Sequence, residues 1–160
     1  MDYYSSIAEG YEKLHKSEQL RKIAIVKKHL KAKSPLLDIG CGTGISTNCW
    51  GKNIECVGID PSPGLLKKMK GKKFLAKTEK LPFKDNTFNT VVSFTALHHC
   101  DIEKAVKEIK RVSKKNATYA FTILKKAKNF KKVVSVLKKN LGPFIEIDDI
   151  HDLILIKTDQ

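Results

Sequence analysis

Three glycines at alternate positions follow a short apolar run and an acid. Residues 36–44 read Leu-Leu-Asp-Ile-Gly-Cys-Gly-Thr-Gly. Glycines at this spacing let the backbone turn sharply out of a buried strand and approach a ligand with no Cβ in the way. A dinucleotide loop would need glycine in place of Ile45, and a phosphate loop would need a lysine that Gly44-Ile45-Ser46 lacks. The loop therefore predicts a site for a nucleoside without phosphates.

A second acid follows Gly40 by twenty residues. Asp60 ends another apolar run, Cys56-Val57-Gly58-Ile59. At the end of the second strand of a strand–helix–strand unit, a carboxylate can accept hydrogen bonds from both hydroxyls of a ribose. A glycine loop alone is a weak signal, but the loop, the acid and their spacing together indicate a nucleoside site.

Residues 36–44 and 56–62 resemble the cofactor motifs of class I S-adenosylmethionine-dependent methyltransferases. Residues 79–88 and 91–99 further resemble the ubiquinone/menaquinone-type (methyltransferase type 11) branch, and the resemblance runs from about Tyr3 to the C-terminus. It implies S-adenosyl-L-methionine as the cofactor and no metal; the alternative is an α/β protein with an incidental glycine-rich turn. The cofactor-binding residues that it implies are Tyr4, Tyr11, Asp38, Gly40, Cys41, Gly42, Gly44, Asp60, Pro61, Thr78, Glu79, Leu81 and Phe94.

The resemblance also assigns several of these residues to parts of the cofactor. It implies that Asp38 and the glycine loop shape the pocket for the methionine end, and that Asp60 holds the ribose. The segment Thr78-Glu79 would meet the adenine, and Phe94 with its neighbours would face the methyl group. A sulfonium methyl group is already activated, so the protein need only bring a nucleophile in line with it and exclude water.

Two pairs of side chains each allow two interpretations. Tyr4 and Tyr11 lie in a segment that resembles the family's N-terminal lid, where a tyrosine can reach the cofactor carboxylate; packing is the alternative role. His98 and His99 are candidates for a general base, by their position and near-neutral pKa, if the acceptor must lose a proton. The alternative is that the two histidines only shape the floor of the pocket.

One position departs from the family pattern. Relatives commonly carry Gly-Asp-Ala-Glu where this chain has Ala76-Lys77-Thr78-Glu79. The aspartate that accepts from the adenine amino group is thereby replaced by Lys77, whose ammonium group has only donors. Thr78, Glu79 or backbone carbonyls must take over the acceptor role, or affinity for the cofactor is reduced.

Alternating strand and helix signals predict a three-layer, doubly wound α/β sheet, and the resemblance implies seven strands with an antiparallel C-terminal hairpin. We expect a single domain over residues 1–160, with a lid and first helix in 1–33, the cofactor-binding core in 34–125 and the last helix and hairpin in 126–160. Helices are expected at residues 17–30, 63–69, 102–112 and 130–137, with another from about Ile45. Strands are expected at residues 36–39, 54–59, 74–76, 90–94, 118–124, 144–147 and 153–157.

Charge and composition restrict the partners and the cellular compartment that we expect for the protein. The net charge of +14 comes almost entirely from lysine, because Arg21 and Arg111 are the only arginines. Such a charge fits either solvated helix faces or a surface that follows the phosphates of RNA. The four cysteines form no Cys-x-x-Cys pair and no zinc-binding spacing, and no apolar run is long enough to span a membrane. The sequence therefore predicts a cytoplasmic protein without a membrane partner.

The acceptor is left open by the sequence. Small-molecule members of the family usually insert a cap between the fifth strand and the closing hairpin, but Leu124 to Phe144 holds one lysine-rich helix. An uncapped site favours a macromolecular acceptor, RNA or protein; the alternatives are a small-molecule methyltransferase and an inactive cofactor-binding partner subunit. The resemblance also puts the third strand at a sheet edge, where some RNA-modifying relatives bind a small zinc-binding activator subunit. The alternative is an edge protected by lysines, namely Lys72, Lys73 and Lys77.

Overall fold

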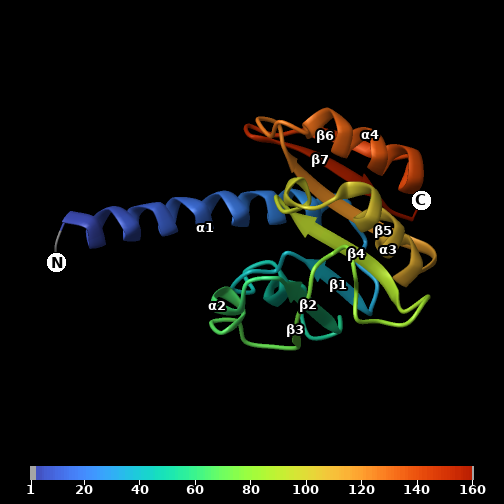
Figure 1. Cartoon of the computed structure of the whole chain (residues 1–160), viewed down its shortest axis with the longest axis horizontal. Coiled ribbons are helices and arrows are strands. Elements are labelled where there is room, and N and C mark those ends of the chain that lie inside the picture. The colour runs from blue at the N-terminus through green and yellow to red at the C-terminus, as the bar shows by residue number, and fades with distance from the viewer. Residues whose placement is uncertain (1–2, 160) are drawn as a thin grey trace.

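The computed structural model describes the backbone of residues 3–159 and the side chains of residues 13–159. Within this range seven strands form one sheet (Figure 1). The strands are β1 (Leu36–Ile39), β2 (Cys56–Asp60), β3 (Lys73–Leu75), β4 (Phe88–Phe94), β5 (Ser113–Leu124), β6 (Ile145–Asp148) and β7 (Asp152–Lys157). The helices are α1 (Tyr3–His29), α2 (Pro63–Leu66), α3 (Ile102–Val112) and α4 (Phe130–Leu141), with the 3-10 turns η1 (Thr47–Cys49) and η2 (Leu97–His99).

The strand order confirms the predicted doubly wound sheet. The order in space is β3-β2-β1-β4-β5-β7-β6, so that it reverses between β1 and β4. Strands β1 to β5 pair in parallel, whereas β7 runs antiparallel to both β5 and β6. The predicted edge position of the third strand and the antiparallel closing hairpin are therefore both present.

Two apolar cores lie on the two faces of the sheet and make the three layers. Leu37 and Ile39 of β1 pack with α3 and α4 on one face. Leu36 of the same strand packs on the other face with Trp50, with Ile23 and Val26 of α1, and with Leu30, which follows the helix. This alternation along β1 is the two-residue period of a strand that is covered on both sides. Within the described residues, no helix has the length and apolar character needed to cross a membrane.

The prediction of a helix beginning at about Ile45 is wrong. The segment forms only the short turn η1, because the hydroxyl groups of Ser46 and Thr47 bond to the buried carboxylate of Asp38 (Thr47 Oγ1 to Asp38 Oδ2, 2.8 Å). Gly51 then turns the chain with a φ of +89°. Side-chain hydroxyls that bond elsewhere compete with helical hydrogen bonding, and here a tertiary contact decides the local structure.

Other differences concern the ends of elements. Helix α1 begins far before the expected residue 17, and α2 ends at Leu66 rather than Met69. Strand β5 begins at Ser113 rather than Thr118, with an irregular register between Phe88 and Thr90 of its neighbour. Its first four residues are a serine, two lysines and an asparagine, so the sequence carries no apolar signal for this part of the strand.

Candidate functional site

The glycine loop after β1 adopts a backbone that other residues do not tolerate. Gly40 has a φ of +71° and Gly44 a φ of +92°, both in the left-handed region. A Cβ on Gly40 would lie 2.5 Å from the Cβ of Ala96, and one on Gly44 would lie 2.8 Å from the Cγ of Met69. The loop can therefore pass close to Ala96, after β4, and to Met69, after α2, only because these two positions lack side chains.

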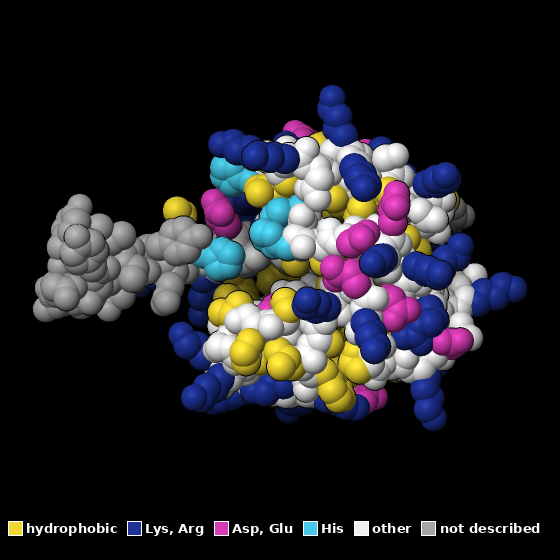
Figure 2. Space-filling view, in the orientation of Figure 1, with side chains coloured by type: hydrophobic (Ala, Val, Ile, Leu, Met, Phe, Trp, Pro, Cys, Tyr) yellow, Lys and Arg dark blue, Asp and Glu magenta, His cyan; other side chains and the backbone are white. Residues whose placement is uncertain are grey.

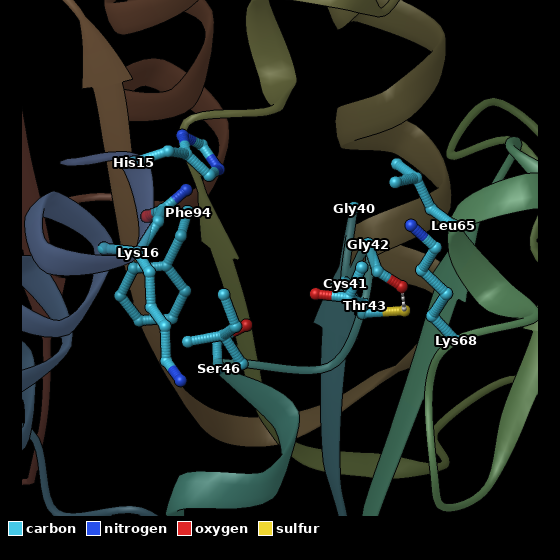
Figure 3. A pocket seen from close by; sticks show the side chains of 12 residues that line it. His15, Lys16, Gly40, Cys41, Gly42, Thr43, Ser46, Leu65, Lys68 and Phe94 are labelled. Carbon is cyan, nitrogen blue, oxygen red and sulfur yellow. Dashed lines mark hydrogen bonds between the residues drawn. The ribbon is translucent and has the colours of Figure 1, made fainter. Parts of the chain in front are cut away.

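A pocket of about 420 Å³ opens beside this loop, at the carboxyl ends of β1 and β4 (Figure 3). Figure 3 shows Phe94 and two residues of α1 on one side of the loop, and two residues that follow β2 on the other. Of the residues that the sequence suggested, the wall contains Gly40, Cys41, Gly42 and Phe94. The remaining lining residues are His15, Lys16, Gln19, Thr43, Ile45, Ser46, Leu65 and Lys68.

Sequence patterns did not indicate the lining residues from α1, or Leu65 of α2 and Lys68, which follows that helix. Lys16 and Lys68 are exposed lysines among many others, and nothing in their spacing separates them from the rest of the lysine-rich surface. The predicted lid residues Tyr4 and Tyr11 have side chains outside the described residues. The part of α1 that is described nevertheless reaches the pocket through Gln19.

Asp38 lies beneath the loop rather than in the wall of the pocket. Its side chain is fully buried, and its Oδ2 accepts hydrogen bonds from the hydroxyls of Ser46 and Thr47. Its Oδ1 is buried and has no hydrogen-bond partner among the described residues. Burial raises the pKa of this carboxyl from 3.8 to about 6, against the opposing effect of the two hydroxyls. The site thus contains a buried acceptor atom that a cationic ligand would satisfy.

Asp60 joins the glycine loop to the segment after β2. Its Oδ2 accepts from the backbone N–H of Gly42 at 3.0 Å, and its Oδ1 accepts from the N–H of Ser62 at 2.8 Å. Each carboxylate oxygen has a second lone pair, so these bonds leave room for ligand hydroxyls. Pro61, which follows, is exposed. Asp60 therefore shapes the loop and keeps lone pairs that can accept from a ligand.

Replacing Asp60 with alanine is expected to weaken binding of S-adenosylhomocysteine by roughly 1–3 kcal/mol, because ligand and loop donors lose their acceptor. Isothermal titration calorimetry measures the affinity, and circular dichroism checks that the fold is retained. Glu55→Ala is the matched control, since Glu55 is an exposed acid just before the same strand and pairs with exposed Lys72 at 3.6 Å. Equal affinities for the two variants would remove Asp60 from the site.

The residues suggested for adenine binding lie outside the wall of the pocket beside the glycine loop. Thr78 is buried, and Glu79 is half-buried with its Oε2 accepting from the N–H of Asp101 at 3.2 Å. Leu81 lies in the core beneath α3, and its N–H donates to Glu108 Oε1 at 3.0 Å. Lys77 is exposed. None of these four residues lines the pocket beside the glycine loop.

Exchanging Lys77 for aspartate is expected to tighten cofactor binding by roughly 0.5–1.5 kcal/mol, because the variant offers the adenine amino group the acceptor that the family pattern supplies. Calorimetric titration with S-adenosylhomocysteine tests this change. Lys84→Asp alters the net charge equally at an exposed position outside the pocket and serves as the control. Binding that is unchanged or weaker in the Lys77 variant would mean that another group already satisfies the amine.

His98 and His99 follow β4 in the turn η2, with ring centroids 3.9 Å apart. His98 is half-buried, and its Nδ1 is buried with no hydrogen-bond partner among the described residues. Burial, followed by the neighbouring His99, lowers the pKa of His98 below its ordinary 6.5. His98 is thus neutral near pH 7 and able to accept a proton. Figure 2 shows histidine side chains on the same face of the molecule as the opening beside α1.

The chain is similar to known methyltransferases. The model of a family described as "Methyltransferase domain" matches residues 37–121. The uncharacterized protein MJ1252 of Methanocaldococcus jannaschii is 34% identical over 98% of this chain and 68% of its own length. The uncharacterized methyltransferase YcgJ of Bacillus subtilis is 29% identical over 72% of this chain and 51% of its own length. The chain thus spans only about half of this second relative.

Solved structures show the same fold. The YcgJ crystal structure superimposes with a TM-score of 0.68 at 18% identity, covering 80% of this chain and 70% of its own. A Haloferax volcanii putative methyltransferase, solved in complex with the Trm112 methyltransferase activator, gives a TM-score of 0.65 at 18% identity over 77% of this chain and 61% of the other. The seven-stranded sheet and its strand order are therefore the architecture expected for this chain's relatives.

Proposed function

Because the chain belongs to the class I S-adenosylmethionine-dependent methyltransferases of the type 11 branch, we propose that it binds S-adenosyl-L-methionine beside the glycine loop and catalyses transfer of its methyl group to an acceptor. The observation that carries the proposal is the place of the pocket. It lies at the carboxyl ends of β1 and β4, where the strand order reverses and where ligands of doubly wound sheets bind.

The residues at the pocket fit this cofactor. Gly40 and Gly42 line the pocket with backbone alone, so that a ligand can approach the loop closely. The unpartnered Oδ1 of Asp38, beneath the loop, and the carboxylate of Asp60, which bonds to the N–H of Gly42, suit a ligand that carries positive charge and ribose hydroxyls. Phe94 adds an apolar wall. When bound, the cofactor supplies a methyl group on a sulfonium that is already activated for attack.

The chain's own residues would orient the reactants and move a proton where one must leave. Phe94 and the glycine loop enclose the inner end of the pocket and exclude water from it. Two histidines follow β4, His98 and His99, and the neutral imidazole of His98 can take a proton from the acceptor. Acceptors that are nucleophilic without deprotonation would not need this step.

We favour a macromolecular acceptor, RNA or protein. Between β5 and β6 the chain contains only α4 and short turns, so no cap from this region covers the pocket. A large acceptor can reach such a site, and the net charge of +14 suits a phosphate backbone. A small-molecule acceptor and an inactive partner subunit are the alternatives.

Incubation with cofactor labelled in the methyl group and fractionated cell extract tests both the reaction and its acceptor. Label in RNA or protein supports a macromolecular acceptor, and label only in small metabolites supports the small-molecule alternative. No transfer, together with calorimetric binding of S-adenosylhomocysteine, would favour the inactive subunit. With an RNA acceptor, binding should weaken steeply as salt concentration rises, because lysines displace counterions from the phosphates.

The β3 edge is the place where we propose that an activator subunit binds. Phe74 and Leu75 of β3 and Leu65 of α2 are exposed by 39%, 61% and 43%, and Figure 2 shows hydrophobic side chains gathered over this region. The side chain of Lys73 does not protect the edge against pairing with another strand, because its Nζ donates to the carbonyl of Met69 at 2.7 Å. Co-expression with a small zinc-binding activator, followed by co-purification, tests the proposal, and Leu75→Lys should abolish the association.

A further inference from the structure

The part of α1 that lines the pocket is not held there by apolar packing. Residues 13–20 include no buried side chain, and Leu14 and Leu20 are 61% and 47% exposed. The first buried residues of the described helix are Lys22 and Ile23. Residues of this exposed stretch nevertheless form one wall of the pocket, among them Gln19. Another kind of contact must hold the helix in this place.

Polar contacts to one turn supply that attachment. Arg21 donates two hydrogen bonds to the carboxylate of Asp149, at 3.0 and 3.3 Å. Lys22 Nζ lies 3.3 Å from Asp152 Oδ2, and both residues of this pair are buried. Asp149 follows β6 and Asp152 is the first residue of β7. We call residues 149–152 the β6–β7 turn. The turn is closed by a hydrogen bond from the N–H of Asp149 to the carbonyl of Asp152 at 2.9 Å.

The inner ion pair also holds a residue with an uncommon backbone. Lys22 donates to the hydroxyl of Thr95, which in turn donates to Asp152 Oδ2 at 2.6 Å. Thr95 has a φ of +53°, in the left-handed region. A β-branched residue is an outlier in that region, and such strain persists only where surrounding contacts fix it. The N–H of Thr95 is fixed as well, by the carbonyl and hydroxyl of Thr122 at 3.0 and 2.9 Å.

Thr95 connects its hydrogen-bond network with Lys22 and Asp152 to the pocket. Thr95 follows Phe94, which forms part of the pocket wall, and precedes Ala96, whose Cβ packs against Gly40. The turn η2 with the two histidines comes next. The conformation of Thr95 therefore sets the direction in which the chain leaves β4 toward the site.

Stability alone does not account for a buried lysine and aspartate. Removing two charges from water costs several kcal/mol per ion, roughly, and well-packed apolar residues are often as stable or more so. Asp152 also keeps a buried Oδ1 with no hydrogen-bond partner among the described residues. The pair lies beside Thr95, the strained residue that follows β4. This position indicates a role for the pair in the site.

We propose that Lys22 and Asp152 are positioning residues for methyl transfer. Together they hold Thr95 in its left-handed conformation, and they join the pocket-lining part of α1 to the β6–β7 turn. Phe94, the glycine loop and the wall from α1 are thereby fixed relative to one another. The inference rests on the proposed function in taking this pocket as the cofactor site.

The test compares Thr95→Val with Thr95→Ser. Valine has the shape of threonine but no hydroxyl, whereas serine keeps the hydroxyl. Hydrogen–deuterium exchange by mass spectrometry should show residues 95–100 exchanging at least tenfold faster in the valine variant and at the wild-type rate in the serine variant. Affinity for S-adenosylhomocysteine should fall at least fivefold with valine only. Identical exchange in the two variants would overturn the proposal.

A second set of variants tests the ion pair. Lys22→Met should accelerate exchange in residues 13–22 and 95–100 alike, by at least tenfold. If the lone buried acid prevents folding, Lys22→Met/Asp152→Leu removes both charges and should show the same acceleration. Lys27→Met is the control, since Lys27 is an exposed lysine of α1 whose Nζ bonds to the carbonyl of Cys49 at 2.7 Å.

The two proposals fail in different ways. A folded double variant with wild-type exchange at residues 95–100 would refute the positioning role while cofactor binding persists. A wild-type protein that binds no S-adenosylhomocysteine would refute the proposed function. The exchange experiment reports on Thr95 in either case, because it needs neither cofactor nor acceptor.

Discussion

Replacing Gly40 with alanine is expected to reduce affinity for S-adenosylhomocysteine at least tenfold. The new Cβ would meet the Cβ of Ala96 at 2.5 Å, so the loop and the segment after β4 must separate. The left-handed φ of +71° adds strain of roughly 1–2 kcal/mol for a residue with a side chain. Because Gly40 and Phe94 line the same pocket, this separation changes its inner end. Calorimetric titration measures the loss.

The substitution Gly51→Ala distinguishes the effect of backbone strain from that of the steric contact with Ala96. Gly51 has a φ of +89°, and a Cβ there would meet nothing within 4 Å. Both variants should lose stability to backbone strain by roughly 1–2 kcal/mol, measured by urea unfolding. Only the Gly40 variant should lose affinity for the nucleoside. Equal losses of affinity in both would show that general destabilisation, rather than the approach of the loop to Ala96, controls binding.

The fold could be predicted from the sequence where apolar runs and turn residues indicate the same strand or helix. Residues 36–39 and 90–94 are mostly apolar, and the structure buries them in the neighbouring central strands β1 and β4. The failures have a common cause. The helix expected at Ile45 is lost to contacts with the carboxylate of Asp38, and the start of β5 is set by pairing with Phe88. Both depend on partners that are distant in sequence.

The candidate site likewise has residues that the sequence predicts and residues that it does not. Gly40, Asp60 and Phe94 come directly after or at the ends of strands, so their meeting follows from the geometry of a parallel sheet. The wall from α1 and the network around Thr95 do not follow from any such rule. Lys22 looks like one more surface lysine in a chain rich in them, and only the packed structure shows that it is buried. The sequence therefore indicates the glycine loop beside the pocket but not the contacts that hold the other side of the pocket.

Asp38→Asn is expected to raise stability at pH 7 while weakening cofactor binding. Asparagine keeps an oxygen to accept from Ser46 and Thr47 but removes a buried charge. Since burial raises the pKa of Asp38 from 3.8 to about 6, the ionised form costs the folded state on the order of 3 kcal/mol at pH 7. Binding of the positively charged cofactor should weaken by roughly 1–3 kcal/mol, as for a lost hydrogen bond to a charged group.

The pH dependence of both effects has a definite sign. Because the pKa of Asp38 is higher in the folded state, that state binds more protons between pH 3.8 and about 6, and the wild-type protein loses stability as pH rises through this window. Below it the carboxyl is neutral in both states and the penalty is absent. Affinity for S-adenosyl-L-methionine should rise over the same window, because the cation favours the ionised carboxylate. Asp38→Asn should flatten both curves.

Urea unfolding and calorimetric titration from pH 4 to pH 8 check these curves in the two proteins. S-adenosylhomocysteine, which lacks the sulfonium charge, serves as the matched ligand. Its affinity should depend less on the ionisation of Asp38 than that of S-adenosyl-L-methionine does. Parallel stability curves for wild type and Asp38→Asn would show that Asp38 is not the group that titrates. A wild-type affinity independent of pH would separate the buried carboxylate from the cofactor, and the unpartnered Oδ1 would then have to be satisfied by water.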